Sequence, residues 1–254
     1  MGSAPQWARQ DGFGIRMEWG RTGAAVLGPG AGCLVVIDVL SFTTSVSVAT
    51  AAGTAVFPYR WRDASARAFA AENAAELAVG RREAGPWSLS PAAIRRAPFT
   101  PRLVLPSPNG STIAAAVERT PVVAACLRNV GAVADWLLAG HWGTPDRPIA
   151  IIPAGEHWPG TDTVRPALED WLGAGALAAA LLDRGRATPS PEARTAATAF
   201  AATTDVGAAI TECASGRELA AIGFAEDVAI AIERDADATV PVLTGNAFVD
   251  RRAR

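Results

Sequence analysis

Acidic and hydroxyl side chains stand at the end of the most strongly apolar run of the chain, Cys33–Leu40, which reads CLVVIDVL. Asp38 lies near the end of this run, and hydroxyl groups follow it in the segment SFTT. A carboxylate in that position is suited to bind a metal ion or to act as a nucleophile, and the hydroxyls can cap a helix. Phosphatases with an aspartyl nucleophile place a second Asp two residues on, where this chain has Leu40. The alternative role for Asp38 is that of a helix cap or a buried hydrogen-bond acceptor.

The segment PSPNGST follows a second apolar run and leads into a helical stretch. Asn109 and Gly110 suit a tight turn with a positive φ, and Ser107, Ser111 and Thr112 supply hydroxyl groups around the helix start. Free backbone N–H groups and the helix dipole at such a start favour a phosphate or another anion. A plain turn followed by an N-cap explains the same residues, so the segment alone leaves both interpretations open.

The segment CLRN, which follows the next apolar run, offers a cation for substrate binding. Arg128 can bind an anion in a bidentate manner, with the amide of Asn129 beside it. A cysteine-phosphatase loop needs five residues between Cys and Arg, and Ala132 stands where that Arg should be. We therefore predict that Arg128 binds an anion and that Cys126 is not a nucleophile.

Carboxylates are the side chains that could hold a metal ion. Glu156 follows an apolar run, and Glu169 and Asp170 stand early in a helical stretch. Together with Asp38 they form the all-oxygen ligand set that Mg²⁺ prefers, whereas the two His of the chain argue against a zinc site. The alternative for Glu169 and Asp170 is a solvated first turn of a helix, where the dipole favours acidic side chains.

Small residues suggest close packing at one further position and a helix cap at another. Gly173 and Gly175 lower the helix propensity of the stretch that contains them, which indicates close backbone packing. Ser215 and Gly216 precede another helical stretch, where we expect them to form a cap with Arg217 facing the site.

Strand-like runs alternate with helical stretches, which predicts an α/β fold of three layers, α/β/α, with a largely parallel sheet. The ligands of such sheets bind outside the carboxyl ends of the strands, where the candidate residues lie. We expect a single domain over residues 1–254, with two intimately packed α/β halves as one possible arrangement. Gly12–Leu27 is expected to be a hairpin or an edge strand, and Gly80–Pro101 a surface connection or a lid. The expected strands are Cys33–Leu40, Thr54–Tyr59, Arg102–Leu105, Pro121–Ala125, Ile149–Pro153 and Thr239–Leu243. The expected helices are Asp63–Val79, Ser111–Glu118, Val130–Ala139, Pro166–Leu182, Pro191–Phe200, Asp205–Cys213 and Gly216–Glu233.

Composition excludes several classes of function. The chain has 254 residues, a net charge of −2 and 23 basic residues, all of which are Arg. The lack of Lys excludes a Walker-type phosphate loop and a Schiff base, and the near-neutral charge argues against a nucleic-acid partner. The three Cys are far apart, which argues against disulfides and indicates a reducing compartment. The longest apolar run has about a dozen residues, too few for a membrane span, so we expect a cytoplasmic protein without a membrane partner.

Taken together and in this order, the segments resemble the 2-phosphosulfolactate phosphatase family, which comprises magnesium-dependent phosphatases of α/β/α architecture. The resemblance runs from Cys33 to Pro241 through VVIDVL, SPNG, LRN, Ala154-Gly155-Glu156, Glu169-Asp170 and SGRELAAIGFAEDV. It implies Mg²⁺ bound by carboxylates and a small anionic phosphate monoester, 2-phosphosulfolactate or a related phosphorylated hydroxy acid, bound by the SPNG and LRN loops. Asp38, Arg128 and Glu169 are then the expected catalytic residues, and a homo-oligomer is possible.

One position departs from the family's pattern. The family has Arg then Ala where this chain has Ser41 and Phe42, so one anion contact is missing. Arg16, Arg60 or Arg62 are candidates to replace that cation from neighbouring elements. The second hypothesis, motivated by the same departure, is a catalytically reduced anion-binding protein on the same fold.

Overall fold

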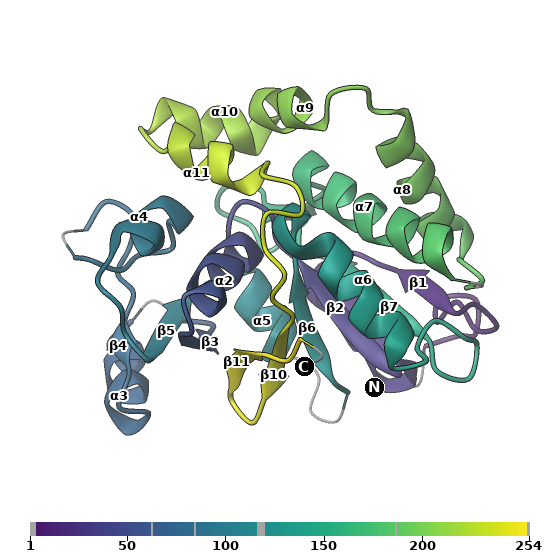
Figure 1. Ribbon diagram of the computed structural model, residues 1–254, viewed down its shortest axis with the longest axis horizontal. Helices are drawn as coiled ribbons and strands as arrows, with labels where there is room; N and C mark the ends of the chain where they lie inside the picture. The colour runs from purple at the N-terminus through teal and green to yellow at the C-terminus, as the bar shows by residue number, and fades with distance from the viewer. Residues whose placement is uncertain (1–3, 62, 84, 116–119, 186, 253–254) are drawn as a thin grey trace.

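The computed structural model describes residues 4–61, 63–83, 85–115, 120–185 and 187–252, and its centre is a nine-stranded sheet (Figure 1). The strand order is β1-β7-β2-β6-β10-β11-β3-β5-β4, and β8 and β9 form a separate hairpin. In chain order the strands are β1 (Ile15–Met17), β2 (Cys33–Ile37), β3 (Ala55–Tyr59), β4 (Glu76–Leu77), β5 (Arg102–Pro106), β6 (Val122–Ala125), β7 (Ile149–Pro153), β8 (Glu156–His157), β9 (Val164–Arg165), β10 (Pro241–Thr244) and β11 (Ala247–Asp250).

Helices cover both faces of this sheet. In chain order the α-helices are α1 (Gly20–Leu27), α2 (Phe42–Ala51), α3 (Ala64–Glu72), α4 (Pro91–Arg96), α5 (Gly110–Ala115), α6 (Val130–Ala139), α7 (Leu168–Arg184), α8 (Pro191–Ala202), α9 (Val206–Glu212), α10 (Ala214–Ala221) and α11 (Ala225–Ala231). Two 3₁₀ turns, η1 (Gly28–Gly30) and η2 (Leu127–Asn129), complete the described elements. Within the described residues, no helix combines the length and apolar character that crossing a membrane requires.

The side chains of β2 show how the layers are held together. All five residues of this strand are buried, and successive side chains of a strand point to opposite faces. Val35 and Ile37 pack in one cluster with α6 and α7, whereas Leu34 and Val36 pack in another with α1, α2 and α5. The uninterrupted apolar run is therefore explained by burial on both faces, and the prediction of a three-layer α/β fold is confirmed.

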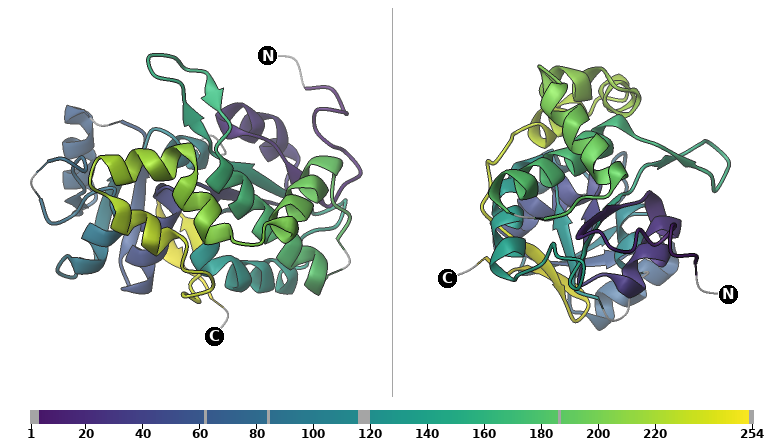
Figure 2. Two further views of the ribbon diagram at one scale, coloured as in Figure 1. Left: turned by 90° about the horizontal axis from the view of Figure 1, so that it is seen from above. Right: turned by 90° about the vertical axis from the view of Figure 1, so that its right-hand side faces the viewer.

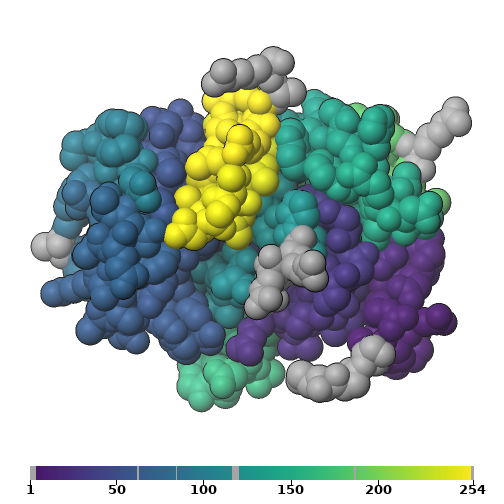
Figure 3. Space-filling view, turned by 90° about the horizontal axis from the view of Figure 1, so that it is seen from below, coloured from purple at the N-terminus to yellow at the C-terminus, as the bar shows by residue number. Residues whose placement is uncertain are grey.

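The sheet is parallel except at its centre. The pairs β1/β7, β7/β2, β2/β6, β3/β5 and β5/β4 are parallel. The hairpin β10–β11 pairs antiparallel with β6 on one side and with β3 on the other. In the view from below, this yellow hairpin lies between the blue segments and the teal and purple ones (Figure 3).

Two substructures lie beyond the sheet at its carboxyl edge. Helices α9, α10 and α11 form a group above this edge in Figure 1, and α11 also packs against α4. The hairpin β8–β9 projects from the body of the molecule, as both views of Figure 2 show. The residues that connect these substructures to the ends of β2 and β7 are therefore close to the predicted site.

Some predicted elements differ from the structure. The Ala-rich stretch Asp63–Val79 contains α3, but the chain leaves the helix at Ala74, where φ is 47°, and then forms β4 because Ala78 is buried against the sheet. The predicted helix Gly216–Glu233 is two helices, since Gly223 has a φ of 90° between α10 and α11. Within Gly12–Leu27 the edge strand β1 is confirmed and is followed by α1. The segment Gly80–Pro101, predicted to be a surface connection or a lid, contains α4. The end of the predicted helix Ser111–Glu118 lies outside the described residues.

Candidate active site

Asp38 lies directly after β2 and connects the first residues of two helices. Its Oδ1 accepts a hydrogen bond of 3.0 Å from the backbone N–H of Phe42 in α2, and its Oδ2 accepts one of 3.0 Å from the N–H of Gly110 in α5. The side chain is buried, and burial raises the pKa of Asp38 to about 6 despite these two bonds. Asp38 is therefore both a hydrogen-bond acceptor, as the alternative interpretation held, and a buried ionisable group at the carboxyl edge.

Gly110 is required where α5 approaches Asp38. A Cβ atom at this position would lie 2.2 Å from Cδ1 of Phe42 and 2.9 Å from Oδ2 of Asp38, closer than real Cβ contacts. The Asn-Gly pair thus lets a backbone N–H reach the carboxylate, which a larger residue would block. The SPNG segment is in this way part of the same site as Asp38.

Asp170 holds the ends of β2 and β7 together. Its Oδ1 accepts a 2.7 Å hydrogen bond from the N–H of Val39, and its Oδ2 accepts a 2.8 Å bond from the N–H of Gly155. Helix α7 comes close enough for these bonds because a Cβ on Gly173 would lie only 2.8 Å from Cγ2 of Val39. The predicted close packing at Gly173 is confirmed, and the solvated-turn interpretation of Asp170 is wrong because the side chain is buried.

Glu169 and Glu156 each have one carboxylate oxygen engaged. Oε2 of the buried Glu169 accepts a 3.2 Å hydrogen bond from the thiol of Cys213, and burial raises the pKa of that thiol to about 11. Oε2 of the half-buried Glu156 accepts a 3.0 Å bond from Nδ2 of Asn109, whose Oδ1 lies 3.0 Å from Nδ1 of His157. Among the described residues, the Oε1 atoms of both glutamates have no hydrogen-bond partner, so these two oxygens are available to a ligand.

The four carboxylates influence one another electrostatically. Burial raises the pKa of Glu156 to about 7, and the charges of Asp38 and Glu169 raise it further. The pKa of Asp170 is also raised, first by burial and then by Glu169 and Asp38. The structure therefore brings the four predicted metal ligands into one region of like charge, although no three acidic, His or Cys side chains of the described chain converge as a ready-made metal cage.

Arg81 is a cation of this region that the sequence did not reveal. Its Nη2 donates a 2.6 Å hydrogen bond to Oγ of Ser41, and its positive charge lowers the pKa of Asp38. A second contact fixes the guanidinium: its Nε donates a 3.3 Å hydrogen bond to Oδ2 of Asp227. Asp227 is completely buried and also accepts a 2.5 Å bond from Ser90. Arg81 therefore stands beside Ser41, the position that carries Arg in the pattern of the family that the sequence resembles.

Arg165 is a second such cation, on the β8–β9 hairpin. Its Nη2 donates a 3.2 Å hydrogen bond to Oγ of Ser215 at the start of α10, and its charge lowers the pKa of Glu156. Of the three arginines proposed earlier as replacements, the two that the structure describes are engaged elsewhere. Arg16 is engaged with the carbonyl oxygens of Arg9 and Phe13, Arg60 stacks on Trp61, and Arg62 lies outside the described residues.

The LRN segment does not reach the four carboxylates. Arg128 pairs with Glu233 and donates a 3.3 Å hydrogen bond to Ser47 in the middle of α2. Asn129 is fully buried, where its amide accepts from the N–H of Cys126 and donates to the carbonyl oxygens of Ala124 and Thr239. These residues thus connect β6, α2 and the chain that enters β10.

The remaining predicted residues contribute in different ways. Ser107 and Ser111 are buried, and Oγ of Ser111 donates to the carbonyl oxygen of Leu105, which fixes the turn before α5. Thr112 is half-buried on α5. Arg217 is exposed on α10, and its side chain has no hydrogen bond or ion pair with any described residue. The predicted cap at Ser215 and Gly216 is wrong: Cys213 is the N-cap, its Sγ accepts from the N–H of Gly216, and Ser215 and Gly216 lie inside α10.

Comparison with protein families agrees with this arrangement. No curated protein matches the chain at a significant level. A family model described as 2-phosphosulpholactate phosphatase matches residues 27–246, and these residues contain β2, the SPNG segment, Glu156, Glu169, Asp170 and the Asp227 anchor. Because the match covers most of the chain, the protein belongs to the 2-phosphosulpholactate phosphatase family of hydrolases.

Proposed function

We propose that the protein is a magnesium-dependent phosphatase that hydrolyses a small phosphate monoester carrying a second acidic group. The observation that carries this proposal is the group of four carboxylates at the carboxyl edge, three buried and one half-buried, with Arg81 and Arg165 beside it. A phosphate monoester is itself an anion, so it would be repelled by this group unless a cation lay between them. A divalent cation among the carboxylates would remove this repulsion, which supports a metal requirement.

The donor set suits Mg²⁺. Mg²⁺ keeps several water ligands and needs only one or two carboxylates besides the substrate's phosphate oxygens, so a three-residue cage is not necessary. Asp38 and Glu169 are the residues that would hold it, because each has a carboxylate oxygen with lone pairs to spare after its hydrogen bonds. When bound, the ion would offset the charge of the phosphoryl group and polarise its oxygens.

Glu156 is suited to move a proton. Asn109 fixes its Oε2, which leaves Oε1 to accept a proton from the attacking water. Burial and the neighbouring carboxylates raise the pKa of Glu156 to about 7, and a general base is most effective when its pKa is near the working pH. Asp170, whose two oxygens each accept a backbone hydrogen bond, acts by positioning the loops after β2 and β7.

The two arginines would bind the substrate's anionic groups. The Nε of Arg81 donates to Asp227 and its Nη2 donates to Ser41. These two bonds fix the orientation of the guanidinium, so its remaining N–H donors are available to a ligand in a defined geometry. A carboxylate or sulfonate next to the phosphate ester would match this fork. A substrate of the 2-phosphosulfolactate type carries such a group, which supports this substrate class over simple alkyl phosphates.

Chelation tests the metal requirement and separates the two hypotheses. We expect phosphate release from p-nitrophenyl phosphate in the presence of MgCl₂, its loss after dialysis against EDTA, and its return when MgCl₂ is restored in excess. Full turnover in excess chelator would contradict the metal requirement. If no phosphate is released under any condition but phosphate esters still bind in calorimetry, the chain is the anion-binding protein of the second hypothesis.

A binding measurement tests the metal site without activity. The pKa of Asp38 rises to about 6 and that of Glu156 to about 7 in the folded chain, so the free energy of unfolding falls as the pH rises from about 4 to 7. Bound Mg²⁺ should offset this loss, so MgCl₂ should raise the melting temperature by about 5 °C at pH 8 and by much less at pH 5. Glu169→Gln should abolish the shift, whereas Glu192→Gln, on the exposed face of α8, should keep it.

A further inference from the structure

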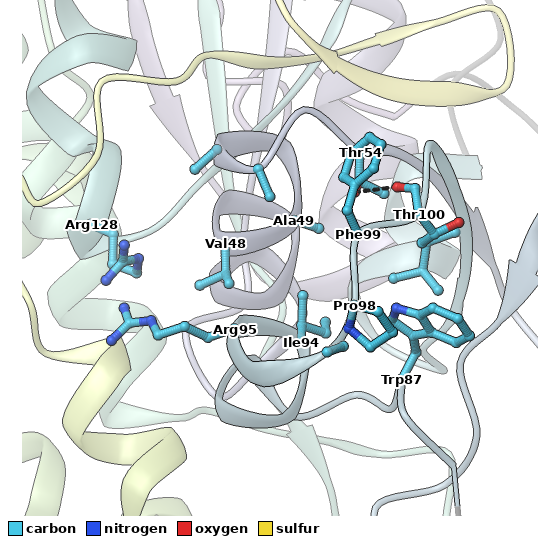
Figure 4. A pocket seen from close by; sticks show the side chains of 14 residues that line it. Val48, Ala49, Thr54, Trp87, Ile94, Arg95, Pro98, Phe99, Thr100 and Arg128 are labelled. Atoms are coloured by element: carbon cyan, nitrogen blue, oxygen red, sulfur yellow. Dashed lines mark hydrogen bonds between the residues drawn. The ribbon is translucent and has the colours of Figure 1, made fainter.

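A hollow lies away from the carboxylates, between α2, α4 and the chain that leads into β5. It has a volume of about 290 Å³, and its walls are mainly apolar side chains, among them Val48, Trp87, Ile94 and Phe99 (Figure 4). Phe99 is 67% exposed at its rim. The proposed phosphatase chemistry makes no use of this hollow.

Two guanidinium groups meet at one end of this hollow, as Figure 4 shows for Arg95 and Arg128. Arg95 reaches it from α4, and Arg128 from the turn after β6. The side chain of Arg128 is only 7% exposed, and its Nε is held by Ser47 of α2. One end of a mainly apolar hollow therefore carries two cations, of which Arg128 is buried and held in place, a combination typical of small-molecule sites in which few polar groups set the orientation.

A carboxylate of the chain already occupies this arginine pair. Arg95 donates bonds of 2.8 and 2.7 Å to the two oxygens of Glu233, and Arg128 pairs with the same carboxylate. Glu233 follows the end of α11 and its side chain is 36% exposed, so it can turn outward without disturbing a packed core. Its position shows that the pair accepts a planar carboxylate in a bidentate manner.

We propose that this hollow is a second ligand site, which binds a small amphipathic carboxylic acid. The apolar body of the acid, an aromatic ring or a branched chain, fills the space beside Val48, Ile94 and Phe99. Its carboxylate takes the place of Glu233 on Arg95 and Arg128. Inorganic phosphate fits less well, because the apolar walls offer it no further donors.

The test uses the full chain and 3-phenylpropionate as the probe, with binding measured by calorimetry. We expect millimolar binding to the wild type, and about tenfold tighter binding to Glu233→Gln, because the amide competes less strongly for the arginines. Arg95→Ala should weaken binding at least tenfold, whereas Arg96→Ala should not, since Arg96 pairs with Glu226 and does not line the hollow. Arg95 is 41% exposed, so its removal is expected to leave the fold intact.

Two control probes test whether the charge and the apolar body of the acid are both needed, and three results would contradict the proposal. 3-Phenylpropanamide, which lacks the charge, and inorganic phosphate, which lacks the apolar body, should each bind at least tenfold more weakly than the acid. Equal binding of the amide would mean a purely apolar hollow, and equal binding of phosphate a purely ionic site. Unchanged affinity in both Glu233→Gln and Arg95→Ala would mean that the acid binds elsewhere.

Discussion

Replacing Asp38 with Asn should lower kcat for phosphate release by on the order of 10²-fold or more, because the negative charge of a metal ligand or nucleophile is lost. The side chain keeps its shape but not all of its hydrogen bonds. Both Asp38 oxygens accept backbone N–H groups, whereas the Nδ2 of Asn accepts none, so one of the bonds to Phe42 and Gly110 breaks. A lower melting temperature is therefore expected together with the loss of activity.

Asp170→Asn provides the matched control, because Asp170 likewise accepts two backbone hydrogen bonds, from Val39 and Gly155. It should lower the melting temperature by a similar amount but reduce kcat far less than Asp38→Asn does. Glu169→Gln gives an independent test of charge, since Glu169 accepts only the thiol of Cys213 from the described residues. If Asp38→Asn folds and keeps most of its activity while Glu169→Gln is also active, these carboxylates are structural and the proposed site is wrong.

Arg81→Ala should lower kcat/KM for 2-phosphosulfolactate by on the order of 10²-fold, mostly through KM. Losing one partner of a buried charged contact costs about 2–5 kcal/mol, which corresponds to a loss between about 30-fold and a few thousand-fold. The loss should depend on the substrate's second acidic group. The variant should therefore treat phospholactate and phosphoglycerate as poorly as the sulfonate ester, but should hydrolyse p-nitrophenyl phosphate nearly as well as the wild type.

Arg82→Ala is the control for this prediction, because Arg82 is the exposed neighbour of Arg81. Asp227→Asn, which weakens the anchor behind Arg81, should raise KM for the anionic esters to a smaller extent. Arg60→Ala should have no effect, since Arg60 stacks on Trp61. Equal losses on p-nitrophenyl phosphate and on the anionic esters would mean that Arg81 only supports the fold.

The acidic half of the site could be predicted because its signals are local. Asp38 directly follows β2, whose burial on both faces is visible in its apolar run. Glu169 and Asp170 begin α7, which comes after β7, the neighbour of β2 in the sheet, and the β8–β9 hairpin. Since parallel strands bring their carboxyl ends to one edge, the topology alone places these residues near one another. The close approach at Gly173 could be identified from a glycine inside a helical stretch. Gly110 was predicted for a different reason, a positive φ, and that prediction is wrong: Gly110 begins helix α5, and a glycine is needed there because the helix approaches Asp38 and Phe42.

The cationic half could not be predicted. Arg81 lies in a segment without periodicity, and its anchor Asp227 is 146 residues further along the chain. Arg128 was predicted to bind an anion because it follows a strand that ends at the same edge as β2. It does follow that strand, but the turn η2 directs its side chain towards Ser47 and Glu233. Sequence spacing gives the edge on which a residue stands, but not the direction in which a long side chain leaves it.

The antiparallel hairpin at the centre of the sheet has a consequence for how the protein is made. The strands β1, β7, β2 and β6 form one parallel group and β3, β5 and β4 another, and among the described strands β10 and β11 join the two groups. These two are translated after every other described strand, so a nascent chain carries two open edges, at β6 and at β3, until the hairpin arrives. This central seam is then the place where the growing chain is most exposed to wrong pairing with a neighbour on the same polysome, and slow translation of the last residues would prolong that exposure.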